Sequence, residues 1–475
     1  MNKIVNAFVC AEKGDKVFLA DIIFDTKIKE IIFHSNFSAE PSELISAMNE
    51  LKAKHNPKKF FDEIDINYNL LIPGAIDPHT HFDEPGFEFR EDFYTGTLSA
   101  AFGGITTVID MPCTSIPPIT NAENLKTKLQ VISKKAIIDF ALWGGVSGTS
   151  FANNEDIEKN MSELAEMGVV GFKTYLISGM EKFTSINYEQ LKKVGEIAKK
   201  LNLPVAVHSE DKEIIEKRRK YFQLQNKNDI ESFCKSRDEQ AEVVAINSVI
   251  KAAKETRANF HIVHITSKKG LQAVENAQKN GIKISAETCP HFLAFTQDDF
   301  KRIGSILKTA PPVKKQKDRE YLWKGLQNES ISFVATDHAG CIPKKEKNTG
   351  SIWTDYAGIP GCELLLPYLF SEGYLKNKIS LKKTVSLLST NAAKFYGLYP
   401  KKGSLEIETD ADFAVINLTE KQEIKGKNLH CKGKYTPFEG ETFSAKIDKT
   451  FYRGEMIVDK RRFFGKKGFG ENLEL

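Results

Sequence analysis

Eight short apolar runs, separated by stretches with the periodicity of amphipathic helices, occupy the middle of this 475-residue chain. A strand and helix alternation repeated eight times is typical of a (β/α)₈ barrel, whose parallel strands are each followed by a helix. The sequence therefore predicts an α/β fold with a TIM barrel over residues 74–398. The runs are LLIPGAID, GITTVIDMP, AIIDFALWGG, VVGFKTYL, LPVAVH, NFHIVHIT, IKISAETCP and ISFVATDHA.

The two ends of the chain share a different texture. Residues 1–73 contain alternating segments such as KVFLADIIF, and residues 399–475 contain DADFAVINL and EMIVD. Strict alternation of apolar and polar residues is typical of half-buried strands. A more helical, polar stretch from Pro41 to about Phe61 interrupts the first of these regions. We expect the two ends to pair into one small β-sandwich domain beside the barrel.

Residues of the metal-ligand type stand at or near the ends of five of the predicted barrel strands. His79 and His81 are two residues apart, so a strand would place both side chains on one face. Such a pair alone also occurs without metal, but a full set of ligands at strand ends favours a metal centre. Barrel enzymes carry their chemistry at this end of the strands. The predicted ligands are His79, His81, Lys173, His208, His264 and Asp337.

Lys173 and Asp337 have particular chemistry in this setting. A lysine inside the barrel mouth beside metal ions would be repelled if charged, so its pKa should fall. A neutral amine can take up carbon dioxide to form a carbamate, whose two oxygens could each bind one ion. The alternative is a lysine that reaches solvent or forms a simple ion pair. Asp337 ends an apolar run, where an unpaired carboxylate is costly to bury, and a metal would remove that cost.

Composition excludes several classes of partner. The net charge of +4 is too small, and the basic residues too dispersed, to indicate nucleic acid. Seven irregularly spaced cysteines give no disulfide framework. No apolar run reaches the length of a membrane span, and the N-terminus lacks the apolar core of a signal peptide. We expect a cytoplasmic enzyme without nucleic-acid or membrane partners.

With these residues in view, the chain resembles the amidohydrolase superfamily, and within it the cyclic-amide hydrolases: allantoinase, dihydroorotase, hydantoinase and dihydropyrimidinase. The likeness extends over ITTVIDMP, VVGFKTYL, AETCPHFL, KTAPPVK, ATDHAGC and STNAAKFYGLYPKKGSLE. The resemblance implies two divalent metal ions, N6-carboxylysine at Lys173, and a homo-oligomer. One ion would be held by His79, His81 and Asp337, the second by His208 and His264, with Lys173 bridging. Mixed imidazole and carboxylate ligands suit zinc, with iron, cobalt or manganese as alternatives.

Which ring the enzyme opens depends on a few positions. Dihydroorotases resemble HxHxRxPG and MPNT, where the arginine and asparagine hold a substrate carboxylate; here Asp83 and Cys113 stand in those places. An acid in place of a cation should repel an anion. HxH(F/I)xEPG, LWGGVSG and IPGCE are similar to allantoinases. We predict an allantoinase-type hydrolase of a small cyclic ureide. The alternatives are a dihydroorotase that uses Arg90 as its anion clamp, and another hydantoinase or dihydropyrimidinase-like amidase.

The expected mechanism is attack on the scissile carbonyl by a hydroxide that bridges the two ions. Asp337 would accept the proton and deliver it to the leaving ring nitrogen. Cys289 also fits a buried packing role, His338 either orients Asp337 or binds substrate, and His261 is predicted to pack. A scaffold without activity and an acyclic deacetylase are the alternatives outside this class. The candidate substrate-binding residues are Asp83, Cys113, Cys289, His291 and His338.

Overall fold

The barrel consists of two parallel sheets in the computed structural model, which describes residues 1–10, 16–56 and 63–474. The first sheet has the order β15-β6-β7-β8 and the second β14-β13-β12-β11-β10-β9. Their strands are β6 (Ala75–His81), β7 (Ile105–Asp110), β8 (Asp139–Leu142), β9 (Gly144–Gly145), β10 (Phe172–Tyr175), β11 (Val205–His208), β12 (Phe260–Ile262), β13 (Ile284–Thr288), β14 (Phe333–Val334) and β15 (His338–Ala339).

Two interrupted strands connect these sheets. Only Trp143 separates β8 from β9, and residues 335–337 separate β14 from β15. Counting each interrupted strand once leaves eight strand positions in chain order, which is the arrangement of a (β/α)₈ barrel. The predicted α/β barrel is confirmed, with one refinement. The first apolar run divides at Gly74, because Leu70–Pro73 forms β5 of a different sheet.

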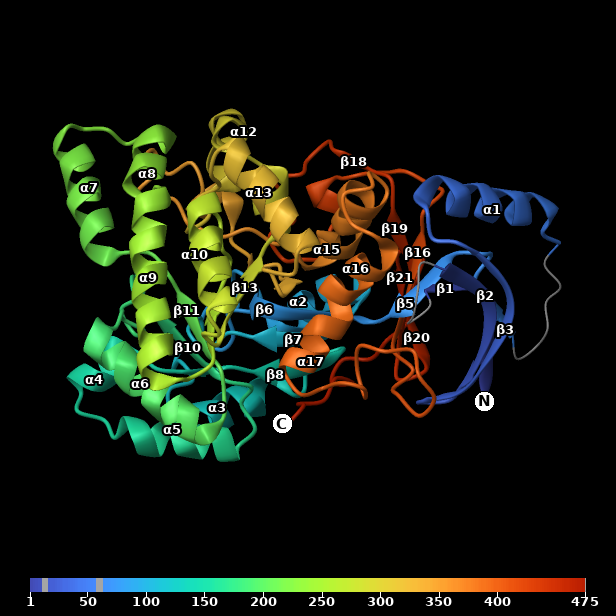
Figure 1. Ribbon diagram of the computed structural model, residues 1–475, viewed down its shortest axis with the longest axis horizontal. Helices are drawn as coiled ribbons and strands as arrows, with labels where there is room; N and C mark the ends of the chain where they lie inside the picture. Colours follow the sequence, from blue (N-terminus) through green and yellow to red (C-terminus); the bar gives the residue numbers. More distant parts are fainter. Residues whose placement is uncertain (11–15, 57–62, 475) are drawn as a thin grey trace.

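Helices surround the barrel strands, and Figure 1 shows them on its outside. Most begin with an Asp, Asn or Ser whose side chain accepts a hydrogen bond from the first turn, as at Asp92, Asn121 and Asn187. The longer helices are α2 (Phe93–Phe102), α3 (Ala122–Ile132), α5 (Ile157–Glu166), α6 (Tyr188–Leu201), α7 (Lys212–Leu224), α9 (Glu239–Thr256), α10 (Lys268–Lys279) and α13 (Gln316–Gln327). Shorter ones are α4 (Gly148–Ala152), α8 (Ile230–Ser236), α11 (Pro290–Ala294), α12 (Gln297–Ile303), α14 (Pro343–Glu346), α15 (Leu365–Tyr368), α16 (Leu381–Val385) and α17 (Asn391–Phe395).

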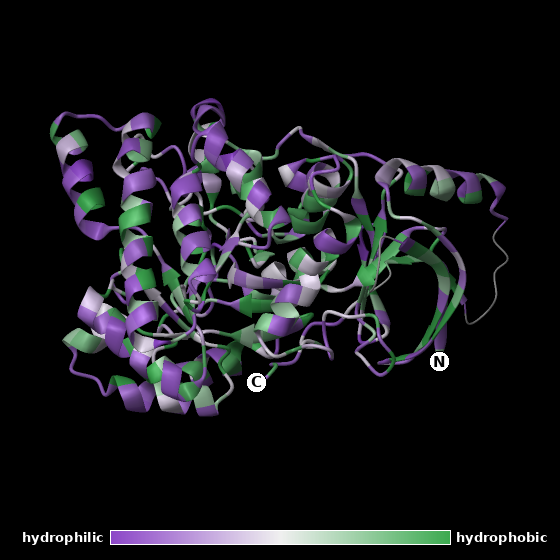
Figure 2. Cartoon of the chain, viewed as in Figure 1, coloured by the Kyte–Doolittle hydropathy of each residue, from purple (hydrophilic) through white to green (hydrophobic). Residues whose placement is uncertain are grey.

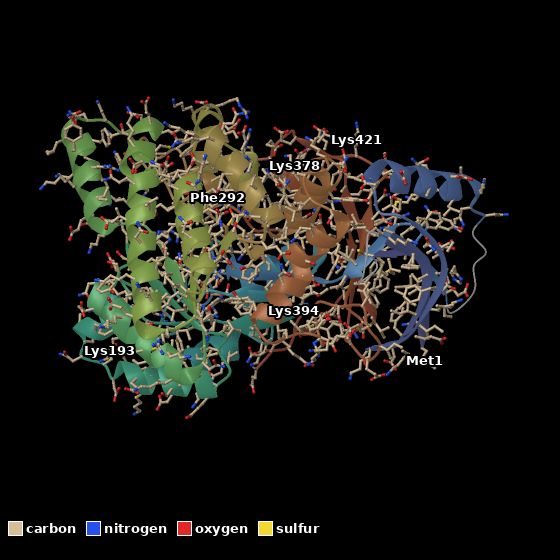
Figure 3. The ribbon with its side chains drawn as sticks, viewed as in Figure 1. Met1, Lys193, Phe292, Lys378, Lys394 and Lys421 are labelled. Atoms are coloured by element: carbon tan, nitrogen blue, oxygen red, sulfur yellow. The ribbon has the colours of Figure 1, made fainter. Side chains whose placement is uncertain are left out.

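Polar and apolar residues alternate along these helices, whereas the central strands are mainly apolar (Figure 2). The labelled lysines Lys193, Lys378 and Lys394 lie on helices or connections that surround the strands (Figure 3). Burial of the strands on both faces explains why the barrel runs lack a polar side. None of the described helices combines the length and apolar character that a membrane crossing requires.

Strands from both chain ends form one nine-stranded sheet, with the order β21-β20-β19-β16-β5-β1-β2-β3 and with β4 paired to β1. The expected pairing of the two ends is therefore confirmed, and Figure 1 shows blue and red strands side by side. These strands are β1 (Asn2–Cys10), β2 (Lys16–Phe24), β3 (Ile28–Ser38), β4 (Glu63–Asp65), β5 (Leu70–Pro73), β16 (Phe413–Asn417), β19 (Lys446–Tyr452), β20 (Glu455–Asp459) and β21 (Arg462–Phe463).

This sheet curls over its own core. Phe24 of β2 and Phe451 of β19 are four strand positions apart, which in a flat sheet would separate them by about 19 Å. Their ring centroids nevertheless lie 6.0 Å apart, with Phe413 5.4 Å from Phe24. One continuous sheet thus encloses an apolar core between its two halves, as a sandwich does. We keep residues 1–73, 74–398 and 399–475 as the proposed division of the chain.

The predicted helical stretch after Pro41 forms α1 (Pro41–Lys54). Leu44 and Met48 are its buried apolar residues, and Lys52 Nζ donates to Asn69 Oδ1 at 2.7 Å and Thr419 Oγ1 at 2.9 Å. These contacts attach the helix to the terminal sheet. The helix ends at Lys54, and the remainder of the predicted stretch falls partly on residues 57–62, outside the described residues.

A buried ionic cluster links the barrel to the terminal sheet. Lys402 Nζ lies 2.6 Å from Asp139, 2.8 Å from Asp410 and 2.6 Å from Asp412. Asp139 belongs to β8 of the barrel, and Asp412 directly precedes β16. The lysine ammonium occupies the position between the three carboxylates, so this group is an ion-pair cluster and not a metal site.

Candidate metal centre

The first three predicted ligands converge at one end of the barrel. His79 and His81 end β6, and Asp337 lies in the break between β14 and β15. Both histidine Nε2 atoms are 3.3 Å from the same oxygen of Asp337. Asp337 has a φ of 50°, an uncommon conformation for a residue with a side chain. This sharp turn at the strand end accompanies the approach of Asp337 to the two histidines.

The second pair of predicted ligands is adjacent to the first. His208 ends β11 and His264 follows β12. His208 Nδ1 and His264 Nε2 are 3.0 Å apart, and the ring of His264 lies 5.5 Å from that of His79. Two imidazole nitrogens at this separation can direct their lone pairs to a common ion. The five residues therefore form two neighbouring ligand groups.

Lys173 is the sixth predicted ligand, and it is fully buried in β10. Its Nζ has no hydrogen-bond partner among the described residues and lies 5.0 Å from the Tyr175 ring centroid. Burial lowers the pKa of Lys173 to about 8. An amine with a lowered pKa is more often neutral, which is the form that reacts with carbon dioxide.

The donors present fit a pair of divalent cations. His79 Nε2 is buried and, within the described part of the chain, has no hydrogen-bond partner. Unpaired buried polar atoms are costly, and a cation bound to these nitrogens would remove that cost. Imidazole and carboxylate ligands are those that zinc and related metals take in catalytic sites.

Two carboxylates behind the ligands were missed by the sequence analysis. Glu287 of β13 contacts His79 Nδ1, and Glu210 Oε2 is 2.9 Å from His208 Nε2. Burial opposes their ionisation, but His79 and His261 lower the pKa of Glu287 to about 2, and Arg237 and His208 do the same for Glu210. The available signals were weak: Glu210 stands two residues after His208, and Glu287 ends a predicted strand.

Cys113 and Asp83 lie beside His81. Cys113 Sγ is 3.7 Å from His81 Nδ1 and 3.1 Å from the Tyr175 hydroxyl. The side chain of Asp83 is buried, and neither oxygen has a partner among the described residues. Burial raises the pKa of Asp83 to about 8. Both residues are therefore next to the ligand group, and Asp83 retains its hydrogen-bonding capacity.

The other three candidate substrate-binding residues differ in their surroundings. His291 is buried in α11, its Nε2 lacks a partner within the described residues, and burial lowers its pKa to about 4. Cys289 is completely buried and precedes α11, as a packing residue would. His338 Nδ1 accepts from the Gly361 and Cys362 amides at 3.3 Å, and its Nε2 is 3.3 Å from Glu91. These contacts favour a positioning role for His338.

Arg90, the alternative anion clamp, is held by other groups. Its guanidinium is 2.6 Å from Glu346 and 4.4 Å from the Tyr356 ring centroid, with Phe87 and Phe89 also stacked on it. Arg90 would have to break its ion pair with Glu346 before it could bind a substrate carboxylate. The arrangement disfavours the dihydroorotase alternative.

Comparisons with known proteins agree with this geometry. Residues 70–457 match the Amidohydrolase family. An allantoinase from Rubrobacter xylanophilus is 34% identical over 402 residues, covering 84% of this chain and 87% of the relative. An allantoinase from Deinococcus radiodurans is 32% identical and covers 85% and 88%. The L-hydantoinase (dihydropyrimidinase) structure from Arthrobacter aurescens has a TM-score of 0.88 at 26% identity, covering 100% of this chain and 99% of its own.

A barrel that brings histidine, lysine and aspartate side chains together at its strand ends is typical of metal-dependent hydrolases of the amidohydrolase type. The chain belongs to the amidohydrolase family, over most of its length.

Proposed function

We propose that this protein hydrolyses the ring of a cyclic ureide, with allantoin as the preferred substrate. The observation that carries the proposal is the buried Lys173, unpartnered among the described residues, in a barrel that also brings together His79, His81 and Asp337. Similarity to allantoinases selects the substrate class. The experiment that tests it is a panel of allantoin, dihydroorotate, hydantoin and dihydrouracil with metal-replete protein.

The residues of the site have separate roles in ring opening. When bound, two divalent ions polarise a carbonyl and lower the pKa of coordinated water to about 7. His79, His81 and Asp337 would hold one ion, and His208 and His264 the other. Asp337 accepts the proton of the attacking water and returns it to the ring nitrogen as the C–N bond breaks.

Lys173 would bridge the two ions as a carbamate. Its neutral amine adds to carbon dioxide, forming an N–C bond and releasing one proton, and the product carries a negative charge shared by two oxygens. The lysine that would carry this group is fully buried. We propose zinc as the metal, because imidazole and carboxylate ligands suit it. We also propose a homo-oligomer, as the resemblance implies.

Metal removal gives the first test. Dialysis against a chelator should abolish ring opening, and activity should return as about two equivalents of zinc are added back, since two ligand groups are present. Elemental analysis alongside the activity assay measures the stoichiometry. At most one ion per fully active chain would contradict a binuclear centre.

Substrate charge gives the second test. Asp83 stands where an anion-binding arginine would be needed, so the protein should favour neutral allantoin over dihydroorotate. The expected ratio of the two kcat/KM values is roughly ten- to a hundredfold, which corresponds to the loss of one charge-assisted contact of about 1.5–3 kcal/mol. Asp83→Arg should raise dihydroorotate turnover and lower that of allantoin. Asp83→Asn is the matched control, because it removes the ionisable carboxyl group without adding a cation and should narrow the preference only in part.

The second test also separates the alternatives. Hydrolysis of dihydroorotate by the unaltered protein, without hydrolysis of allantoin, would overturn the substrate assignment. Arg90→Gln would then show whether Arg90 leaves Glu346 to bind the carboxylate, because dihydroorotate turnover would fall. A preference for hydantoin or dihydrouracil would instead place the protein with the hydantoinases that its fold resembles.

A further inference from the structure

The two ligand groups are supported from behind by different carboxylates. Glu287 contacts Nδ1 of His79, and Glu210 lies 2.9 Å from Nε2 of His208. Both carboxylates are about 1% exposed. A histidine that donates one ring N–H to a carboxylate has its other nitrogen fixed as a lone pair, ready for a metal. Each predicted ion therefore has one ligand whose tautomer and orientation are set by a buried acid.

The hydrogen bonds behind His79 can be assigned a direction. A carboxylate only accepts hydrogen bonds. Glu287 therefore accepts from His79 Nδ1 at one oxygen and from His261 Nε2, 3.2 Å away, at the other. Neutral His261 then accepts at Nδ1 from the Ser285 hydroxyl, 2.7 Å away. This chain of donors leaves Nε2 of His79 as a lone pair, and that atom faces Asp337.

The two supporting acids differ in charge compensation. Glu210 forms an ion pair with Arg237 as well as its contact with His208. Glu287, in contrast, has ion-pair contacts only with His79 and His261 among the described residues. With neutral histidines, the His79 group together with Asp337 and Glu287 carries two negative charges. The His208 group together with Glu210 and Arg237 carries none.

We propose that Glu287, with His261 and Ser285 behind it, is a positioning residue that makes the His79–His81–Asp337 group the tighter metal subsite. Glu210, whose charge is neutralised by Arg237, leaves the His208–His264 group as the weaker subsite. The two ions are then bound in sequence. This inference rests on the two-metal site of the proposed function. It assigns a role to His261, which the sequence analysis placed among the packing residues.

A zinc titration of the metal-free protein against a chromophoric chelator tests the proposal. The unaltered protein should show two binding steps, the first at least about tenfold tighter. Loss of a partner behind a metal ligand typically costs 10–100-fold in affinity. Glu287→Gln should weaken the tight step by roughly that factor, because an amide cannot accept from both histidines. Glu210→Gln should weaken the second step instead.

Glu363→Gln is the matched control. Glu363 is a buried acid 3.1 Å from Nδ1 of His430, a histidine outside the ligand set, so this variant should bind zinc as the unaltered protein does. Ser285→Ala is a second variant, which keeps the proposal testable if Glu287→Gln does not fold. It removes the hydroxyl next to His261 and leaves Glu287 in place, and it should weaken the tight step to a smaller degree and leave the second unchanged.

The outcomes separate the two proposals. Failure of the unaltered protein to bind two zinc ions would overturn the proposed function. Two sites of unchanged affinity in both Glu287→Gln and Ser285→Ala, or equal weakening of both steps by either variant, would overturn this inference and leave the hydrolase assignment intact.

Discussion

Replacement of Lys173 by alanine should lower kcat for ring opening by about a thousandfold. The expected cause is loss of the bridging anion. Metal polarisation contributes several kcal/mol to such reactions, and each 1.36 kcal/mol corresponds to a factor of ten. Lys173 is fully buried, so its removal also leaves a space in the site. Added acetate or propionate, together with zinc, should enter that space and restore part of the activity.

Lys173→Arg is the matched variant for this experiment. Arginine carries a positive charge, cannot form the carbamate, and fills the space, so this variant should be as inactive as Lys173→Ala and should not respond to added acids. Intact-protein mass spectrometry under conditions that preserve carbamates should find one carbon dioxide on the unaltered protein. An unmodified Lys173 in fully active protein would contradict the proposal.

Replacement of Lys402 by methionine should destabilise the fold by about 3–5 kcal/mol, the usual cost of removing one partner from a buried ionic group. The ammonium of Lys402 lies within 2.8 Å of Asp139, Asp410 and Asp412. Burial by itself lowers the pKa of Lys402, but Asp412, Asp139 and Asp410 raise it far above its ordinary value. Without the lysine, Asp139 keeps its ion pair with Arg453, and Asp410 and Asp412 lose an ion-pair partner.

The midpoint of urea denaturation measures this effect. Lys401→Met is the control, because Lys401 is the exposed neighbour of Lys402, and surface substitutions usually change stability by no more than about 0.5 kcal/mol. Equal midpoints for the two variants would show that the cluster contributes little to the attachment of the terminal sheet. Ring opening by folded Lys402→Met should be unchanged, since the cluster contains none of the predicted ligands.

The barrel and the convergence of its candidate ligands were predictable because the signals are local. Apolar runs of strand length followed by amphipathic stretches define each β/α unit without reference to the rest of the chain. His81 and His208 end their strands, and the ends of parallel barrel strands meet at one face. The candidate ligand set therefore followed from the position of each residue within or just after its predicted strand.

The division of the first apolar run between two sheets could not be predicted from local sequence patterns. LLIPGAID is continuous in hydrophobicity, yet Leu70–Pro73 pairs with β1 and β16 while Ala75–His81 pairs with β7. Both segments are fully buried, so their composition does not distinguish a strand of one sheet from a strand of the other. Only the hydrogen-bond partners make that distinction.

The residues that contact the candidate ligands from behind could not be predicted from local sequence patterns. Glu287 is 208 residues from His79, and Arg237 is 27 residues from Glu210. Nor does periodicity reveal that Glu346 and Tyr356 hold Arg90 away from the role of anion clamp. The sequence by itself determined which residues are candidate metal ligands and where along each predicted strand they stand, since strand periodicity and the barrel's common face are properties of short segments. Which acids contact His79 and His208, and that Arg237 pairs with Glu210, was decided by the tertiary structure, because buried polar groups must find partners wherever the fold brings them.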